Sequence, residues 1–157
     1  MPNYQITLYK HGLIVMLIGL VSGFFLAFSL LGEIGLSPIP FVIEMEIFGS
    51  PARWKAAHLG NMMNGMVLIL FASALPNFKL SDNLTSKITI GLLITAWGNF
   101  AFYMFALIAP NRGLSLEGNR LGEFNWAGPF SYVGGVLAAV ALITIAVVLI
   151  RALPKAK

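Results

Sequence analysis

Residues 12–32 read GLIVMLIGLVSGFFLAFSLLG and contain no Asp, Glu, Lys or Arg. A helix needs about 20 mostly apolar residues to cross the ~30 Å hydrocarbon core of a bilayer, so this stretch is long enough to span it. Three further stretches of at least this length also lack charged side chains, at 56–78, 88–111 and 124–150. None of the four alternates strictly between apolar and polar residues, as a barrel strand would. The chain is therefore predicted to cross a membrane four times as helices.

The composition supports the same fold class. Of the 157 residues, 58% are hydrophobic and only 10% are charged, whereas soluble domains carry about 25% charged residues. The chain has no cysteine, which excludes disulfides, iron–sulfur clusters, thiolate metal sites and cysteine nucleophiles. The net charge is +4, but the basic residues form no block, so no nucleic-acid partner is expected. We predict an all-α integral membrane protein.

Prolines and caps indicate where the four helices begin and end. Ser50 before Pro51 is a typical N-cap followed by proline in the first turn, and Pro76 and Pro110 mark the ends of the second and third helices. The apolar segment 34–48 is expected to lie along the membrane surface. The chain is thus predicted to be one membrane domain, 1–157, a four-helix bundle with helices at approximately 11–32, 51–76, 83–109 and 129–152.

The distribution of lysine and arginine favours one orientation in the membrane. Four crossings put both termini on the same side. That side carries six Lys and Arg residues and the other side four: Lys10, Lys79, Lys87, Arg151, Lys155 and Lys157 against Arg53, Lys55, Arg112 and Arg120. Because cytoplasmic loops carry an excess of positive charge, both termini are predicted to be cytoplasmic.

Polar residues within the apolar stretches are candidate functional groups, because lipid excludes them unless they have a role. They are His58, Asn61 and Asn64 in the second helix, and Thr95, Asn99 and Tyr103 in the third. The last three are spaced i, i+4 and i+8, which places them on one helical stripe. Counting 1.5 Å per residue from the helix ends brings Asn64 and Tyr103 to similar depth. These groups are predicted to form one buried polar pocket; hydrogen bonding between helices is the alternative interpretation.

His58 is the histidine expected at depth, since His11 falls at the opposite end of the membrane. Gly60 and Gly65 follow it, and small residues allow a flat ring to approach a helix. This setting is compatible with an axial haem ligand, although a lone histidine is also common as a hydrogen-bonded residue near the interface. Either role is open from these residues alone.

Gly19 and Gly23 form a small-xxx-small pair in the first helix. Such a pair allows two helices to pack closely. It suits a seam between subunits or packing within one chain, and the spacing does not separate the two.

Several motifs are specific enough to identify a family. Their order and spacing, from about residue 11 to the fourth helix, resemble those of the styrene oxide isomerase family, small membrane enzymes of bacterial styrene degradation. The motifs are Pro40-x-x-Ile43-Glu44, Gly49-Ser50-Pro51-x-x-Trp54-x-x-Ala57-His58, Asn64-Gly65-Met66, Trp97-x-Asn99, Phe102-Tyr103 and Pro110-Asn111-Arg112-Gly113-Leu114, with Asn119 and Gly122 downstream.

The resemblance implies a homotrimer of four-helix subunits in the bacterial inner membrane, with haem b near the subunit interfaces. It implies that His58 is the axial ligand of the haem iron and that Asn64 and Tyr103 line the substrate site. The family has an aspartate in that site where this chain has Thr95. Thr95 and Asn99 are expected to be secondary groups of the pocket.

The implied reaction opens an aryl epoxide such as styrene oxide and rearranges it to an aldehyde by a 1,2-hydride shift. Ferric haem acts as a Lewis acid toward the epoxide oxygen, and the pocket must be dry because water would trap the intermediate cation as a diol. Two other functions stay open from the sequence. One is a haem-binding electron-transfer subunit of a membrane complex, and the other is a small channel or structural membrane protein without a cofactor.

Overall fold

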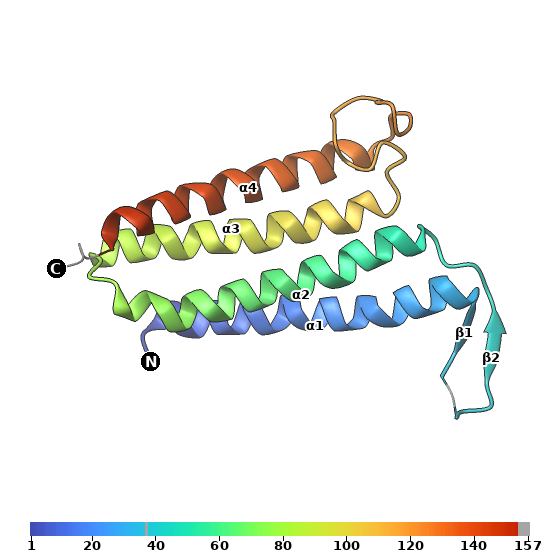
Figure 1. Cartoon of the computed structure of the whole chain (residues 1–157), viewed down its shortest axis with the longest axis horizontal. Helices are drawn as coiled ribbons and strands as arrows, with labels where there is room; N and C mark the ends of the chain where they lie inside the picture. Colours follow the sequence, from blue (N-terminus) through green and yellow to red (C-terminus); the bar gives the residue numbers. More distant parts are fainter. Residues whose placement is uncertain (37, 154–157) are drawn as a thin grey trace.

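The computed structural model describes residues 1–36 and 38–153 and contains four long helices in this part of the chain (Figure 1). Each helix is long and apolar enough to cross a membrane. They are α1 (Asn3–Leu31), α2 (Pro51–Ala74), α3 (Asp82–Ala106) and α4 (Ala127–Ala152), with a short 3-10 helix, η1 (Leu75–Asn77), after α2. The prediction of four helices suited to spanning is confirmed.

The helix bounds differ most from the prediction at the start of α1, which begins at Asn3 rather than near residue 11. The polar N-terminal residues continue the helix because they bond to α2. Gln5 donates to the carbonyl of Ala72 at 2.8 Å, and the hydroxyls of Tyr9 and Ser73 are 2.7 Å apart. The charge on Lys10 had suggested a helix end, whereas the helix continues through that residue.

A small β-hairpin joins α1 to α2, so the all-α prediction is incomplete. Strands β1 (Glu33–Gly35) and β2 (Val42–Glu44) pair antiparallel, with Ile34 opposite Ile43. Gly32 ends α1 in the left-handed region at φ 72°, which turns the chain into β1. The hairpin lies at the end of α1 and α2 and runs across the helix axes, as Figure 1 shows, and the position of segment 34–48 along a membrane surface stays a prediction.

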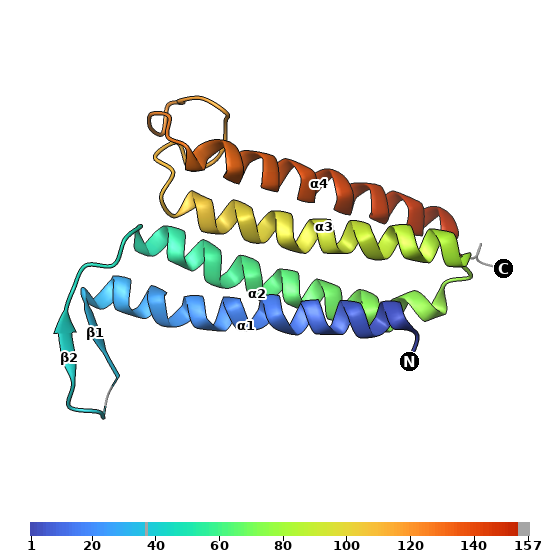
Figure 2. The ribbon, with the colours of Figure 1, turned by 180° about the vertical axis from the view of Figure 1, so that it is seen from behind.

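The four helices lie side by side in chain order across both ribbon views, and α1 packs most on α2 while α3 packs most on α4 (Figures 1 and 2). Both termini lie at one end, which we call the terminus end; the hairpin and the loop 107–126 lie at the other, the loop end. This agrees with an even number of crossings. Lys155 and Lys157, which entered the charge count, lie outside the described residues.

Glycines bring the paired helices close together. A Cβ at Gly12 of α1 would lie 2.9 Å from the carbonyl oxygen of Gly65 in α2, and one at Gly98 of α3 would lie 2.6 Å from that of Gly134 in α4. Gly19 packs in the same way on the backbone of Met62. The pair at positions 19 and 23 therefore serves α1–α2 packing inside the chain rather than leaving an open seam.

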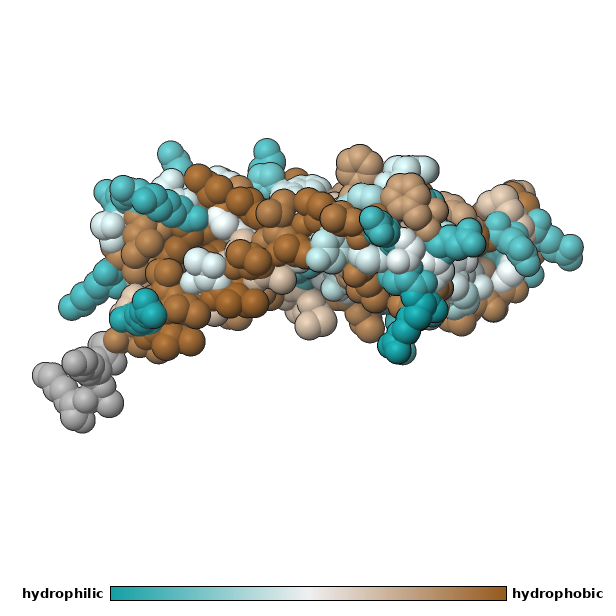
Figure 3. Space-filling model, turned by 90° about the horizontal axis from the view of Figure 1, so that it is seen from above, coloured by the Kyte–Doolittle hydropathy of each residue, from teal (hydrophilic) through white to brown (hydrophobic). Residues whose placement is uncertain are grey.

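The main apolar core fills the terminus end. Its fully buried side chains include Leu8, Val15, Leu68 and Leu92, contributed by α1, α2 and α3. A much smaller cluster around Trp54 and Leu107 occupies the loop end. Outward-facing surfaces of the helices are apolar, and Figure 3 shows hydrophobic residues over the helical part of one face with hydrophilic residues toward both ends. The helices are thus covered by apolar side chains on the outside as well as between them.

Candidate functional site

Asn64 and Asn99 meet between α2 and α3, as the predicted polar pocket requires. The amide nitrogen of Asn99 donates to the side-chain oxygen of Asn64 at 3.0 Å. Asn64 is only 8% exposed, and its own amide nitrogen is buried without a partner in the described part of the chain. Folded proteins rarely leave a buried donor unpaired, because the lost hydrogen bond to water is not replaced. The Asn64 amide is therefore an unpaired buried donor behind Asn99, which itself lines a cavity described below.

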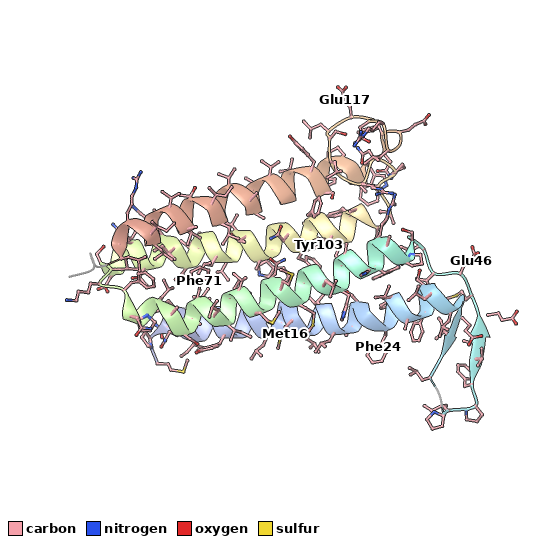
Figure 4. All side chains as sticks on the ribbon, viewed as in Figure 1. Met16, Phe24, Glu46, Phe71, Tyr103 and Glu117 are labelled. Carbon is pink, nitrogen blue, oxygen red and sulfur yellow. The ribbon has the colours of Figure 1, made fainter. Side chains whose placement is uncertain are left out.

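Tyr103 lies between α2 and α3 (Figure 4), and it lines a cavity together with Asn99. Its ring packs directly against Gly60 of α2, where a Cβ would collide with the ring, so glycine at this position makes room for the tyrosine. The neighbouring Phe102 ring lies edge-on to it at 5.2 Å between centroids. The structure gives the Tyr103 hydroxyl no hydrogen bond to any described residue, so this hydroxyl is a donor available to a bound molecule.

Thr95 is not part of this arrangement. Its hydroxyl donates to the carbonyl of Gly91 at 2.9 Å and lies 3.4 Å from the carbonyl of Ala138 in α4. The predicted stripe bends because four residues advance a helix by 400°, so each step along it turns about 40°. Asn99 and Tyr103 face α2, whereas Thr95 has turned toward α4. The structure therefore unites Asn64, Asn99 and Tyr103 and leaves Thr95 in the α3–α4 interface.

Two adjacent cavities open beside Tyr103. One of about 220 Å³ lies between α2, α3 and the loop that follows α3, and the other of about 280 Å³ lies between α3 and α4. Phe102, Tyr103 and Leu114 line both. The first is otherwise formed by Ser50, Ala52, Arg53, Ala56, Ala106 and Arg112, and the second by Asn99, Gly113, Tyr132, Gly135, Val136 and Ala139. The site is an apolar space with a few polar groups converging on it.

Leu114 and Tyr132 are lining residues that the sequence reasoning missed. The search for polar residues within the apolar stretches passed over a leucine in a loop and a tyrosine near the start of α4. The motif at residues 110–114 carried a usable signal, because Asn111 is fully buried and organises the loop. Its side-chain oxygen accepts from the backbone N–H of Gly113 at 3.0 Å, and its amide donates to the carbonyl of Glu117 at 2.8 Å. This loop covers the cavities from the loop end.

His58 is half-buried on the opposite side of α2, against α1. Its Nδ1 lies 2.8 Å from the carbonyl oxygen of Gly19, and its ring packs on Gly23. A carbonyl can only accept, so Nδ1 carries the hydrogen and Nε2 has a free lone pair. A histidine whose other nitrogen is fixed by a backbone carbonyl is the usual arrangement for a metal ligand. No described residues form a cluster of three or more His, Cys, Asp or Glu that could hold a metal ion.

Two further polar residues were weighed from the sequence. Asn61 is fully buried; its amide donates to the Ala57 carbonyl at 2.9 Å, and its oxygen has no partner in the described chain. His11 lies inside α1, about two turns from its start rather than at the helix end that the sequence suggested, and its Nδ1 accepts a 3.1 Å hydrogen bond from the Trp97 indole. His11 is thus engaged with α3 and remote from the cavities around Tyr103.

Comparison with known proteins identifies the family. A model of the styrene oxide isomerase family matches residues 4–154. The chain belongs to this family. A styrene-oxide isomerase of Pseudomonas fluorescens is 34% identical over 141 residues, which cover 86% of this chain and 82% of the relative. The resemblance predicted from the motifs is confirmed, and the chain is an isomerase of the styrene oxide isomerase family.

Proposed function

We propose that the protein, embedded in the bacterial inner membrane with cytoplasmic termini, rearranges an aryl epoxide to an aldehyde in the cavities beside Tyr103. The observation that carries this proposal is the Tyr103 hydroxyl, which has no hydrogen bond to a described residue and lines an apolar space. Asn99 lines the same space and is bonded to the buried Asn64. An epoxide needs donors only at its oxygen and apolar walls elsewhere. Family membership supports the reaction class.

Haem b is the proposed cofactor, with His58 as its axial ligand. The residues fit this role, because Nδ1 is held by Gly19 and the Nε2 lone pair is free. Gly23 leaves room for the imidazole to lie against α1, and Gly19 supplies the carbonyl that holds Nδ1. When bound, ferric haem supplies a Lewis acid toward the epoxide oxygen.

The chain's own residues then act on the substrate. As the benzylic carbon–oxygen bond breaks, negative charge grows on the oxygen, and the Tyr103 hydroxyl, which lines the cavities, is the donor we assign to it. The Asn64 amide is the proposed second donor, reached from the cavity next to Asn99. Asn99 holds the Asn64 side chain in the orientation that aims this amide. A hydride moves from the oxygen-bearing carbon to the benzylic carbon as the carbonyl forms, so the reaction needs no external reductant or oxidant.

Exclusion of water is the second task of the chain. Phe102 and Leu114 wall both cavities, and the loop held by Asn111 closes them toward the loop end. A benzylic cation that met water would become a diol, so this apolar enclosure favours the hydride shift. A surrounding bilayer adds to the dryness and concentrates an apolar epoxide.

The positions of His58 and Tyr103 support assembly as a homo-oligomer, with a homotrimer as the proposed state. Gly60 and Asn64 are two and six residues beyond His58, which places them about 200° and 240° around the helix. His58 accordingly packs on α1, whereas Gly60 and Asn64 face α3. A haem ligated by His58 cannot also reach Tyr103 of the same chain across the body of α2. The haem is proposed to lie between subunits, with His58 from one and the Tyr103 cavity from the next.

The test is to purify the protein in detergent, record its absorption spectrum and incubate it with styrene oxide. A Soret band together with phenylacetaldehyde as product is the expected result. A Soret band without aldehyde would support an electron-transfer subunit instead. A protein that neither takes up haem nor turns over the epoxide would contradict the proposal and favour a channel or structural role.

A further inference from the structure

Two arginines converge on the cavity that Tyr103 lines between α2 and α3. Arg53 comes from the first turn of α2 and Arg112 from the loop after α3, and both contribute to its wall. The rest of this wall is mostly apolar, formed by alanines, Phe102 and Leu114. The cavity therefore has an apolar interior and a strongly cationic edge.

Arg53 and Arg112 contribute two guanidinium groups to the wall of one cavity. Arg53 donates from Nη1 to the carbonyl of Leu107 at 3.1 Å, which uses one of its five donors. The other charged side chain in this wall is Arg112, a second cation. Two like charges beside an apolar cavity repel each other, and an anion between them would remove that repulsion.

The surroundings add to the positive potential. Ser50 is the N-cap of α2, yet its side chain makes no capping hydrogen bond, and it lines the same cavity. The first turn of α2 presents backbone N–H groups and the positive end of the helix dipole there. Arg112 is held in the left-handed region at φ 58°, which is unusual for a residue other than glycine. The adjacent Asn111–Gly113 hydrogen bond of 3.0 Å fixes this turn.

The position of Arg53 along α2 indicates which bound molecule the anion belongs to. Arg53, Gly60 and Asn64 are separated by seven and four residues, so all three lie within about 40° on one face of α2. That face contacts Tyr103 and Asn99, opposite His58. An anion at Arg53 therefore sits over the same cavity as the reacting groups.

We propose that Arg53 and Arg112 form a carboxylate subsite that binds the propionate groups of the haem. This inference rests on the proposed function. Haem is a flat apolar ring with two carboxylates along one edge, and that edge suits two arginines at the rim of a small apolar cavity. Arginine binds carboxylates with paired, charge-assisted hydrogen bonds.

The test compares haem with its dimethyl ester, in which both propionates are neutral. Full-length protein is produced without haem, placed in phosphatidylcholine vesicles and titrated with each compound by the Soret absorbance. Wild type is expected to bind haem at least about tenfold more tightly than the ester, since a charged hydrogen bond contributes on the order of one factor of ten. The comparison is made on wild type first, so it does not depend on the folding of any variant.

Variants then assign the preference to the two arginines. The double variant Arg53→Gln/Arg112→Gln is expected to bind haem and ester alike, and Arg53→Lys/Arg112→Lys is expected to regain part of the preference. Arg120→Gln is the matched control, because Arg120 is an exposed arginine in the same loop that lines neither cavity beside Tyr103. It is expected to keep the full wild-type preference.

Equal binding of haem and ester by wild type would overturn the carboxylate subsite while leaving haem binding intact. Competition for the site by phosphatidylglycerol in the vesicles, with no preference for haem over ester, would assign it to lipid phosphate and also overturn the inference. Failure of wild type to bind either compound would overturn the proposed haem function itself.

Discussion

The two ends of the helix set differ in what their polar groups do. At the terminus end the polar side chains are paired: Gln5 with Ala72, Tyr9 with Ser73, and Trp97 with His11. At the loop end the hydroxyl of Tyr103 has no partner among the described residues, and two cavities open beside it. The unpaired amide of Asn64 is buried near the middle of α2. The terminus end is built for stability, and the loop end keeps the Tyr103 donor for a bound molecule.

The cores show the same contrast. Large aliphatic side chains such as Leu68 and Leu92 form the main buried cluster, toward the terminus end. The loop end instead has Trp54 and Leu107 with few buried neighbours. Glu46 and Glu117 project away from the helices at the loop end (Figure 4). Matched substitutions at the two ends should therefore separate catalysis from stability.

The largest effect on activity is expected from replacing His58, with His11 as the histidine for comparison. His58→Ala should abolish haem binding and turnover, because it removes the proposed ligand while the helix stays apolar. His11→Ala at the terminus end should retain haem and activity and lose only the hydrogen bond from Trp97. The measurement is the Soret absorbance per protein together with aldehyde formation. A full haem complement with an unchanged spectrum in His58→Ala would refute the ligand assignment.

The second-largest effect on activity is expected from replacing Tyr103, with Tyr9 as the tyrosine for comparison. Tyr103→Phe should lower kcat about 10²–10³-fold, since it removes one donor to the developing alkoxide. Tyr9→Phe removes a hydroxyl that bonds Ser73 far from the cavities and should leave kcat unchanged. Initial rates are compared at equal haem occupancy. Equal rates for the two variants would show that the Tyr103 hydroxyl takes no part in the reaction.

A smaller effect is expected at Asn99, which orients Asn64 without being aimed at the substrate in this proposal. Asn99→Ala should lower kcat about tenfold, because a misplaced donor loses part of its effect. Gln5→Ala, which loses a hydrogen bond of similar length at the terminus end, should change only the melting temperature. Asn64→Ala is measured alongside. If Asn99→Ala loses as much activity as Asn64→Ala, the two asparagines act as one unit.

The smallest effect on turnover is expected at Thr95. Thr95→Ala should change kcat less than about threefold and reduce stability by about 1 kcal/mol or less, the usual contribution of a hydrogen bond between membrane helices. Thr95→Asp should bring no gain, because the side chain faces the carbonyls of Gly91 and Ala138. Rates and melting temperatures of the three proteins test this. If Thr95→Ala keeps its haem but is inactive, then Thr95 takes part in the reaction and is not only a packing residue.

Much of the fold could be predicted because every segment that spans lipid must be long, apolar and hydrogen-bonded within itself. Charge-free length located all four helices, and Pro51 marked the start of α2 to the residue. The start of α1 could not be read in this way, since Gln5 and Tyr9 continue the helix through partners 64 or more residues away. The hairpin at 33–44 was missed because its strands are too short for a strand pattern to stand out.

The site could be predicted only in part, because sequence spacing does not fix the direction in which each side chain points around its helix. Sequence spacing found Asn64, Asn99 and Tyr103, which do converge. It also included Thr95, because spacing of four residues ignores the drift of about 40° per step that turns it toward α4. It put His58 in the same helix as Asn64 without showing that the two face different neighbours. Which neighbour each face meets depends on packing that no single helix encodes.

The central claim is that the loop end holds a dry cavity in which a hydride migrates within the substrate. It is tested most directly with styrene oxide that carries two deuterium atoms on its terminal carbon, incubated with the haem-loaded protein in ordinary water. The account predicts phenylacetaldehyde that retains both deuterium atoms, one of them moved to the neighbouring carbon, with no diol. Loss of deuterium to the solvent, or formation of the diol, would contradict it.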